Sequence, residues 1–405
     1  MVPWIYDFLL LIMLFVLYRA GKSIAITGKI WSLAGFSAIL VYTLNEGLRF
    51  GRGVDYNLYG MEYERLEATG QSDWDISFQF VARVLIDLNI PWQGYVILMS
   101  FVFILAMLIM LKVYQEIIPY ALPLFALFSA GSVENMVRWY FGFSFILIGL
   151  VYLLNEERKS VLRYWIFCAI ACTFHLALLP LALVFYAVSY LKKNYLSPIW
   201  SLSLYFSLAF FFQTDFMLQF VDLVNIVASS VGETNEHFAG YGDKAEYWLT
   251  GGFAGVEQRA LPDIQELLFL VTIVVLGYKT KRISDFKCTY AYNIFILGFC
   301  FSPVSNQIEL LGRYDAPLMF FRAVVWGYVL KYMFEMRVIV VKRIVLLLSL
   351  LFFLNIGRRT FMAPFKVNSE KFLYIWDSQG RTYQSMYDMW IFDMYNADSH
   401  NKKND

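Results

Sequence analysis

Long apolar runs recur along the whole chain, separated by short polar connections. About twelve of these runs approach the roughly 20 residues that an α-helix needs to cross a bilayer. We expect spans near residues 3–18, 30–48, 92–112, 119–132, 139–154, 163–175, 176–191, 197–217, 263–278, 288–303, 316–334 and 338–357. The pattern lacks the short alternating segments of an outer-membrane barrel. It therefore predicts an all-α polytopic membrane protein with about twelve transmembrane or re-entrant helices.

Composition narrows the class further. Of the 405 residues, 59% are hydrophobic and only 16% are charged, whereas a soluble domain usually has about 25% charged residues. This excludes a soluble enzyme with a single anchor and a disordered chain. Basic and acidic residues nearly balance, at 33 and 32, so we expect no nucleic-acid partner. We expect one integral membrane domain over residues 1–357, with long loops at 49–91 and 218–262, followed by a tail at 358–405.

The placement of lysine and arginine predicts the orientation. The connections rich in these residues are 19–29, 155–163, 192–194, 279–287 and 331–343. The positive-inside rule puts these connections in the cytoplasm, and it puts both termini, both long loops and the tail on the outer side. The stretch 164–190 fits either one tilted crossing or two short helices that meet near His175. We prefer two helices, because they keep both flanking basic loops on one side.

The two long loops carry different patterns. Within 49–91, apolar residues from Phe78 to Ile86 recur at helical spacing beside charged ones, which predicts an amphipathic helix in the membrane interface. The 218–262 loop is rich in glycine and acidic residues and fits either a mobile lid or a plain connector. Asp73 and Asp75 resemble a paired-aspartate cation site, and an N-cap at Asp73 explains them at least as well.

The outward helix ends gather the candidate chemistry, and together they predict an outward-facing active-site cavity. The candidates are Glu46, Arg49, Arg52, Asp55, Tyr56, Tyr59, Arg138, His175, Arg313 and Tyr314. Charge at membrane depth is costly, so such residues are candidates for function. The arginines suit a pyrophosphate, because arginine recognises phosphate oxygens in pairs. The structural alternatives are a salt-bridged helix end, interface anchors and a hydrogen-bonded histidine.

Several of these residues stand in an order that resembles a known family. The stretch from Arg49 to Tyr59, Arg-Phe-Gly-Arg-Gly-Val-Asp-Tyr-Asn-Leu-Tyr, resembles the R-x-G-x-D-Y-x-x-Y-like signature of the EpsG/Wzy family of exopolysaccharide and O-antigen polymerases. Arg138 stands where that family tends to have an Arg-Gln pair, although Trp139 replaces the glutamine. The positions of His175 and of Arg313-Tyr314 are also similar to family elements.

The resemblance implies a polymerase on the outer face of the bacterial cytoplasmic membrane. Such enzymes move a glycan from undecaprenyl pyrophosphate to the nonreducing end of another lipid-linked repeat unit. It implies the lipid bilayer and a chain-length regulator as partners, with no cofactor and no metal. We expect the pyrophosphate to bind Arg52 and Arg313, supported by Arg49 and Arg138. His175 is the first candidate for the general base, Asp55 and Glu46 are the alternatives, and Tyr56, Tyr59 and Tyr314 are expected to contact glycan.

Two other functions remain open on the sequence alone. A lipid-linked oligosaccharide flippase also has about twelve spans and membrane cations, but we expect it to bury its cations in a central cavity. A polyprenyl-phosphate-sugar-dependent membrane glycosyltransferase typically uses acidic residues in an early outer loop, which keeps Asp73 and Asp75 in view.

Overall fold

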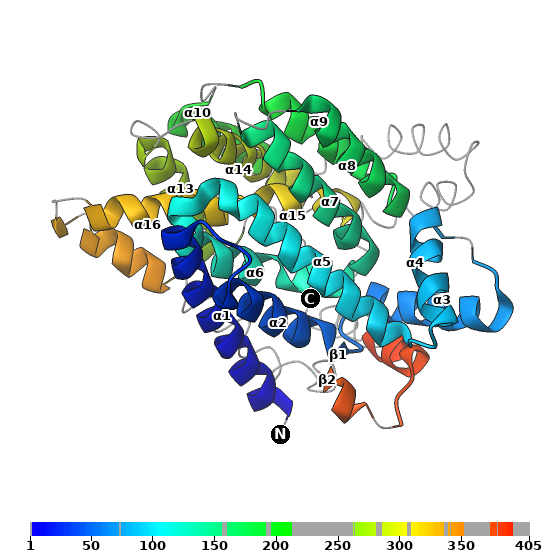
Figure 1. The fold of residues 1–405 in the computed structure, drawn as a ribbon. Coiled ribbons are helices and arrows are strands. Elements are labelled where there is room, and N and C mark those ends of the chain that lie inside the picture. Colours follow the sequence, from blue (N-terminus) through cyan, green and yellow to red (C-terminus); the bar gives the residue numbers. More distant parts are fainter. Residues whose placement is uncertain are drawn as a thin grey trace, which may run out of the picture.

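A computed structural model of the protein shows a bundle of α-helices with a small group of short elements at one end (Figure 1). It describes residues 2–72, 74–155, 160–191, 196–212, 262, 264–280, 286–305, 309–335, 339–340, 342–351, 373–378 and 380–391. Asp73 and the predicted loop at 218–262, apart from residue 262, lie outside the described residues.

The first half of the chain builds one side of the bundle. Its elements are α1 (Val2–Thr27), α2 (Leu33–Gly47), β1 (Arg49–Phe50), α3 (Val54–Thr69), α4 (Ile76–Asp87), α5 (Trp92–Leu111), η1 (Lys112–Ile117), α6 (Ile118–Asn135), α7 (Val137–Leu154), α8 (Val161–Phe174) and α9 (Leu178–Val188). Helix α1 packs against α2 and α6, and α5 packs against α2 and α7. The predicted amphipathic helix in the 49–91 loop is confirmed as α4, whereas α3 was not predicted.

The second half packs against α6 and α9. Its elements are α10 (Pro198–Phe212), α13 (Ile264–Thr280), α14 (Phe286–Ser305), α15 (Glu309–Met319), α16 (Arg322–Glu335), β2 (Leu373–Tyr374) and η6 (Ile375–Asp377). The predicted span 316–334 is wrong in detail, because it is not one helix: α15 ends at Met319 and α16 begins at Arg322. Arg313 and Tyr314 therefore lie on a helix and not in a connecting link. Helix α1 also continues to Thr27, so Arg19 and Lys22 lie on it and not in a loop.

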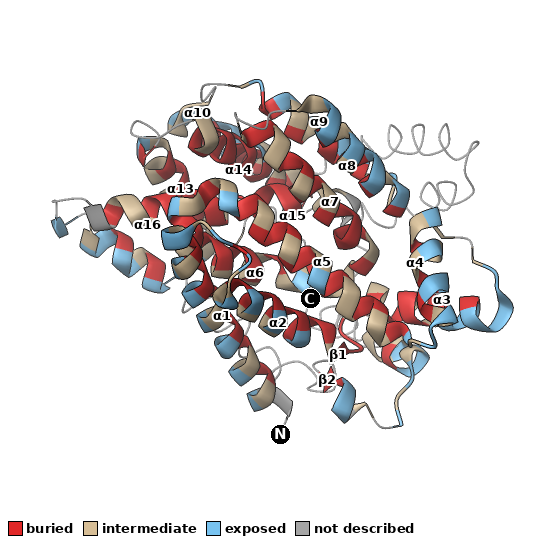
Figure 2. Ribbon diagram, viewed as in Figure 1, coloured by how far each residue is buried: buried red, intermediate tan, exposed pale blue. Residues whose placement is uncertain are grey.

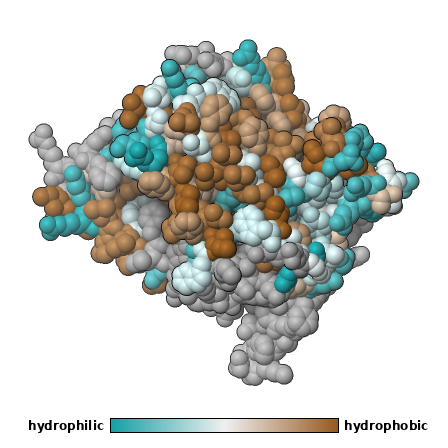
Figure 3. Space-filling view, turned by 60° about the horizontal axis from the view of Figure 1, so that its bottom comes forward, coloured by the Kyte–Doolittle hydropathy of each residue, from teal (hydrophilic) through white to brown (hydrophobic). Residues whose placement is uncertain are grey.

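The bundle is apolar both inside and on much of its surface. Its core is one continuous cluster of buried hydrophobic side chains (Figure 2). Large hydrophobic side chains are also exposed, among them Phe8, Phe15 and Leu40, and hydrophobic residues gather over the middle of the face in Figure 3. Such a surface needs a lipid solvent.

Four helical stretches among the described residues are long and apolar enough to cross a membrane: Trp4–Thr27, Trp92–Asn135, Val137–Leu154 and Phe286–Ser305. The structure is thus that of an all-α polytopic membrane protein, with fewer helices that meet this length than the predicted twelve.

Helices α8 and α9 form a hairpin whose tip is His175. The Tyr164 hydroxyl, near the start of α8, donates to the Ala182 carbonyl of α9 at 2.6 Å, and its ring stacks on Tyr186. The two helices have 14 and 11 residues, and at about 1.5 Å per residue neither spans the roughly 30 Å of a hydrocarbon core. The prediction of two short helices meeting near His175 is confirmed.

The predicted outward helix ends share one end of the bundle. Gln93, at the start of α5, donates to the Arg49 carbonyl after α2 at 3.0 Å. Asn135, at the end of α6, accepts from the Asp55 amide at 2.9 Å. At the other end, Gln115 donates to the Ala25 carbonyl of α1. Helices that alternate in direction therefore bring the end of α2, the start of α5 and the end of α6 together at one end of the bundle.

Part of the predicted tail returns to this same end. Strand β2 pairs with β1 in antiparallel register, with Arg49 opposite Tyr374 and Phe50 opposite Leu373. Beyond it, Trp390 donates to the Gly51 carbonyl at 2.8 Å, from a helical segment at residues 383–391. The C-terminal segment thus holds the loop between α2 and α3 in place.

Candidate active site at one end of the helix bundle

Two polar groups of residues lie side by side at this end. The first, which we term the buried network, comprises Asn45, Glu46, Arg49, Arg52, Glu134 and Tyr374. The second, which we term the half-open cluster, comprises Asp55, Asp75, Arg138, His175 and Arg313. The loop of residues 48–53 separates Glu46 in one from Asp55 in the other.

Arg49 is fully buried, and the contacts described for its side chain are all to other buried or partly buried groups of the protein. Its side chain is 0% exposed and ion-paired with Glu46 at 3.7 Å. The same guanidinium donates to the Val133 carbonyl at the end of α6 at 3.2 Å and faces the Tyr56 ring at 5.6 Å. The arginine thereby satisfies backbone carbonyls that the end of a helix leaves open.

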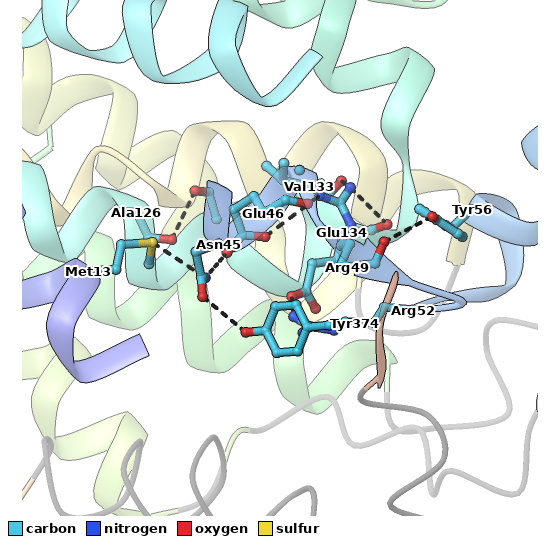
Figure 4. Close-up of polar contacts among 12 residues, drawn as sticks. Met13, Asn45, Glu46, Arg49, Arg52, Tyr56, Ala126, Val133, Glu134 and Tyr374 are labelled. Carbon is cyan, nitrogen blue, oxygen red and sulfur yellow. Dashed lines mark hydrogen bonds and ion pairs between the residues drawn. The ribbon is translucent and has the colours of Figure 1, made fainter. Parts of the chain in front are cut away.

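Arg52 is equally enclosed. Its side chain is 2% exposed and pairs with Glu134 at 2.9 Å, between the rings of Tyr374 at 4.4 Å and Tyr6 at 4.8 Å. Figure 4 shows Arg52, Glu134 and Tyr374 close together, and the Tyr374 hydroxyl donates to Asn45 at 3.1 Å. A charge so completely desolvated is stable only because it is paired and covered by rings.

Glycine residues set the path that turns the chain from the buried network to the half-open cluster. Gly51 and Gly53 have φ of +69° and +102°, a region that other residues rarely adopt. A Cβ on Gly53 would also lie 2.6 Å from the Asn135 side chain, which caps the start of α3. This turn places Asp55 in the first turn of α3.

The half-open cluster joins side chains from α3, α7 and α15. Arg313 of α15 lies 3.8 Å from the Asp55 carboxylate, and the two side chains are 28% and 23% exposed. Arg138, in the first turn of α7, pairs with Asp75, the residue before α4, at 2.5 Å. Both arginines therefore remain partly open to solvent, unlike Arg49 and Arg52.

Aromatic rings line the half-open cluster. Trp74 and Tyr59 face the Arg138 guanidinium at 4.9 and 5.7 Å. On the other side, Trp139 packs edge-on against His175 and against Tyr314, with ring centroids 4.9 and 5.5 Å apart. Trp139 is the residue that departs from the family pattern, and here it joins α7 to the α8–α9 hairpin and to α15.

Electrostatics distinguish Asp55 and His175 in the half-open cluster, both of which lie outside the four helical stretches that are long enough to cross a membrane. Burial raises the pKa of the Asp55 carboxyl, and the positive charges of Arg313 and Arg138 partly offset this. Burial lowers the pKa of His175 well below its usual value, and the same two arginines add to the effect. His175 is therefore neutral at physiological pH, and the Asp55 carboxylate is the stronger base of the two groups.

The structure brings together Asp55, Arg138, His175, Arg313 and Tyr314, all of which the sequence singles out. It places Glu46, Arg49, Arg52 and Tyr56 apart from them in the interior, where each is at most 2% exposed. Tyr59 is also buried, but its ring faces Arg138 of the half-open cluster and packs edge-on against Trp74, with the ring centroids 4.7 Å apart. Sequence reasoning missed Trp74, Glu134, Asn135, Trp139 as a site residue, and Tyr374.

The fold and this site define the class: a polytopic α-helical membrane protein with paired arginines and carboxylates at one end of the bundle. The family model of the EpsG family matches residues 32–366, which is most of the chain, so the chain belongs to that family. Membership indicates an exopolysaccharide-related polymerase. No curated protein and no solved structure is a significant match to the chain.

Proposed function

We propose that this chain polymerises a polysaccharide by moving a glycan from undecaprenyl pyrophosphate to the nonreducing end of another lipid-linked repeat unit. Family membership supports the general activity. The single observation that carries the proposal is the half-open cluster, in which Arg138, Arg313, Asp55 and His175 converge from four separate elements at one end of the bundle.

Arg138 and Arg313 are the proposed pyrophosphate ligands. Each already faces a carboxylate, Asp75 or Asp55, so the protein holds both guanidinium groups where an anion can reach them. A pyrophosphate presents more charge and more oxygen atoms than a single carboxylate, so it competes well for the two arginines. Their partial burial strengthens that attraction relative to bulk water.

Asp55 is the proposed general base. The acceptor hydroxyl transfers its proton to the Asp55 carboxylate while its oxygen forms a bond to the sugar anomeric carbon. The bond from that carbon to the pyrophosphate oxygen breaks, and the electron pair leaves with the pyrophosphate. Arg138 and Arg313 stabilise the charge that develops there. A raised pKa brings Asp55 closer to the pH at which a base works best.

His175 takes a supporting role in this proposal, which reverses the order expected from the sequence. Burial lowers its pKa and two neighbouring arginines lower it further, so it stays neutral and is a weak base. A neutral imidazole both donates and accepts hydrogen bonds, which suits it to orient the acceptor sugar. Tyr314, a partly exposed ring that packs edge-on against the buried Trp139, provides apolar surface for the face of a sugar ring.

The proposed location is the bacterial inner membrane, with the half-open cluster on the periplasmic face. The distribution of lysine and arginine supports that orientation, since the basic connections alternate with the segments that meet at this end. We further propose a chain-length regulator as a protein partner, and the lipid-linked oligosaccharide and the bilayer as the other partners.

A metal-dependent polyprenyl-phosphate-sugar transferase is less well supported. Its expected cation site needs Asp75, and that carboxylate faces Arg138. Asp73 lies outside the described residues.

Reconstitution tests the proposal directly. The purified chain in vesicles should convert a synthetic undecaprenyl-pyrophosphate repeat unit into a ladder of longer products on a gel. A ladder that survives chelation also argues against the metal-dependent transferase. Movement of the intact lipid between leaflets, with no ladder from the cognate repeat unit, would overturn the proposal in favour of a flippase.

A further inference from the structure

A seam between α4 and α8 lies beside the half-open cluster. Ser77 of α4 donates a hydrogen bond to Thr173 of α8, with the hydroxyl oxygens 2.7 Å apart. Ser77 follows Asp75 by two residues, and Thr173 precedes His175 by two residues. The seam therefore adjoins the Arg138 ion pair on one helix and His175 on the other.

Both helices expose apolar side chains next to this seam. In and just after α4, the exposed hydrophobic residues fall four apart along one face, namely Ile76, Phe80, Val84 and Leu88. On α8 the corresponding set is Leu162, Ile166 and Ile170. Figure 2 shows both helices exposed on one side and buried on the other, which is the pattern of helices that border lipid.

The contacts across the seam are easy to open. The Ser77–Thr173 hydrogen bond is exposed, so water can replace either partner at little cost. The Asp75–Arg138 pair is also partly exposed, and an incoming pyrophosphate competes with Asp75 for the arginine. Helix α4 is held to the bundle by its other face, through Phe78, Ala82 and Leu85.

A polyprenyl substrate constrains the route of entry. Its hydrocarbon chain stays in the bilayer, while its pyrophosphate has to reach Arg138 and Arg313. The substrate therefore has to enter from the side, through an opening that joins the lipid-facing surface to the half-open cluster.

We propose that the α4–α8 seam is the lateral entry for the polyprenyl chain, and that α4 moves away from α8 to admit it. This inference rests on the proposed function, since it names the path of that function's lipid substrate. It assigns Ser77 and Thr173 to the gate and not to the chemistry.

A disulfide across the seam tests the gate. The double variant Ser77→Cys/Thr173→Cys, in a Cys172→Ser background, places two thiols where the hydroxyls lie within bonding reach. Each single variant is a control, and Cys172→Ser removes the half-buried native thiol beside the new one. Polymer formation is compared in oxidised and reduced protein, with an undecaprenyl substrate and with a short-chain prenyl analogue that dissolves in water.

The expected result depends on the lipid. Oxidation should lower the rate with the undecaprenyl substrate by about tenfold or more, and reduction should restore it, because the gate motion limits access. The short-chain analogue should be used at nearly equal rates in both states, because it can arrive from the aqueous side. Equal rates with both substrates, or equal loss with both, would overturn the gate. If the reduced double variant and the unmodified chain both form no polymer, the proposed function itself fails.

Discussion

Arg52 and Arg313 lie at the same end of the helix bundle, yet their surroundings differ. Arg52 is 2% exposed, pairs with Glu134 at 2.9 Å and lies between two tyrosine rings. Arg313 is 28% exposed and faces Asp55 at 3.8 Å. Solvent and a mobile anion can reach only the second. The comparison teaches that an arginine near a membrane surface can complete the interior as readily as it can bind a ligand.

The partly exposed arginines should be the most sensitive to substitution. Replacing Arg313 or Arg138 with alanine should lower the polymerisation rate roughly 100-fold or more, because a charge-stabilising donor is lost from the transition state. The amount of folded protein in the membrane should not change. Arg313→Lys is the matched control and should recover part of the rate, since it keeps the charge but not the paired geometry. Normal polymer from both alanine variants would rule out these ligands.

Asp55→Asn should come next, with a loss on the order of 100-fold if the carboxylate is the base. In the unmodified protein the rate should fall as pH drops, because protonation removes the base. The midpoint should lie above the usual range for an aspartate, since burial raises the pKa of Asp55. This acidic limb should be absent from Asp55→Asn and present in His175→Gln. A limb that disappears only in His175→Gln would assign the base to His175 instead.

Arg52→Ala should act on stability. It leaves the Glu134 carboxylate without its partner in a nearly closed site, which costs about 3 kcal/mol. We expect a lower unfolding temperature in detergent and less protein in the membrane, with activity falling only in proportion. The compensating double variant Arg52→Met/Glu134→Leu should restore both. A fully folded Arg52→Ala protein without activity would instead place Arg52 in the chemistry.

Tyr374→Phe should have the smallest effect. It removes the 3.1 Å hydrogen bond to Asn45 but keeps the ring over Arg52, so we expect a loss of about 1 kcal/mol. Polymer length should be unchanged. Tyr374→Ala is the informative partner, because it removes the ring as well and should lower the unfolding temperature further. Equal unfolding temperatures for both variants and the unmodified chain would show that Tyr374 of β2 does not stabilise the buried network.

Local patterns predict much of this fold. Apolar periodicity locates the helices, and charge placement correctly groups Asp55, Arg138, His175 and Arg313 at one end. The amphipathic pattern around Phe78 also predicts α4. These features depend on residues close together in sequence, or on the simple alternation of helix direction across a membrane.

Pairings between distant segments could not be predicted in this way. Glu134, which pairs with Arg52, lies 82 residues away from it in sequence, and Tyr374, which covers Arg52, lies much farther away in sequence. Asp75 looks like a cation ligand in sequence, yet it faces Arg138. Such distant partners determine whether an arginine side chain is exposed or buried, and the periodicity of hydrophobic residues along the sequence does not reveal them.

Binding of undecaprenyl pyrophosphate to the purified protein separates the role of the open arginines in ligand binding from their role in catalysis. We expect Arg138→Ala and Arg313→Ala each to weaken binding by about tenfold or more, whereas Arg52→Met/Glu134→Leu should bind nearly as well as the unmodified chain. Loss of binding in the double variant, with binding retained in both alanine variants, would show that the ligand binds the buried arginine and not the open ones.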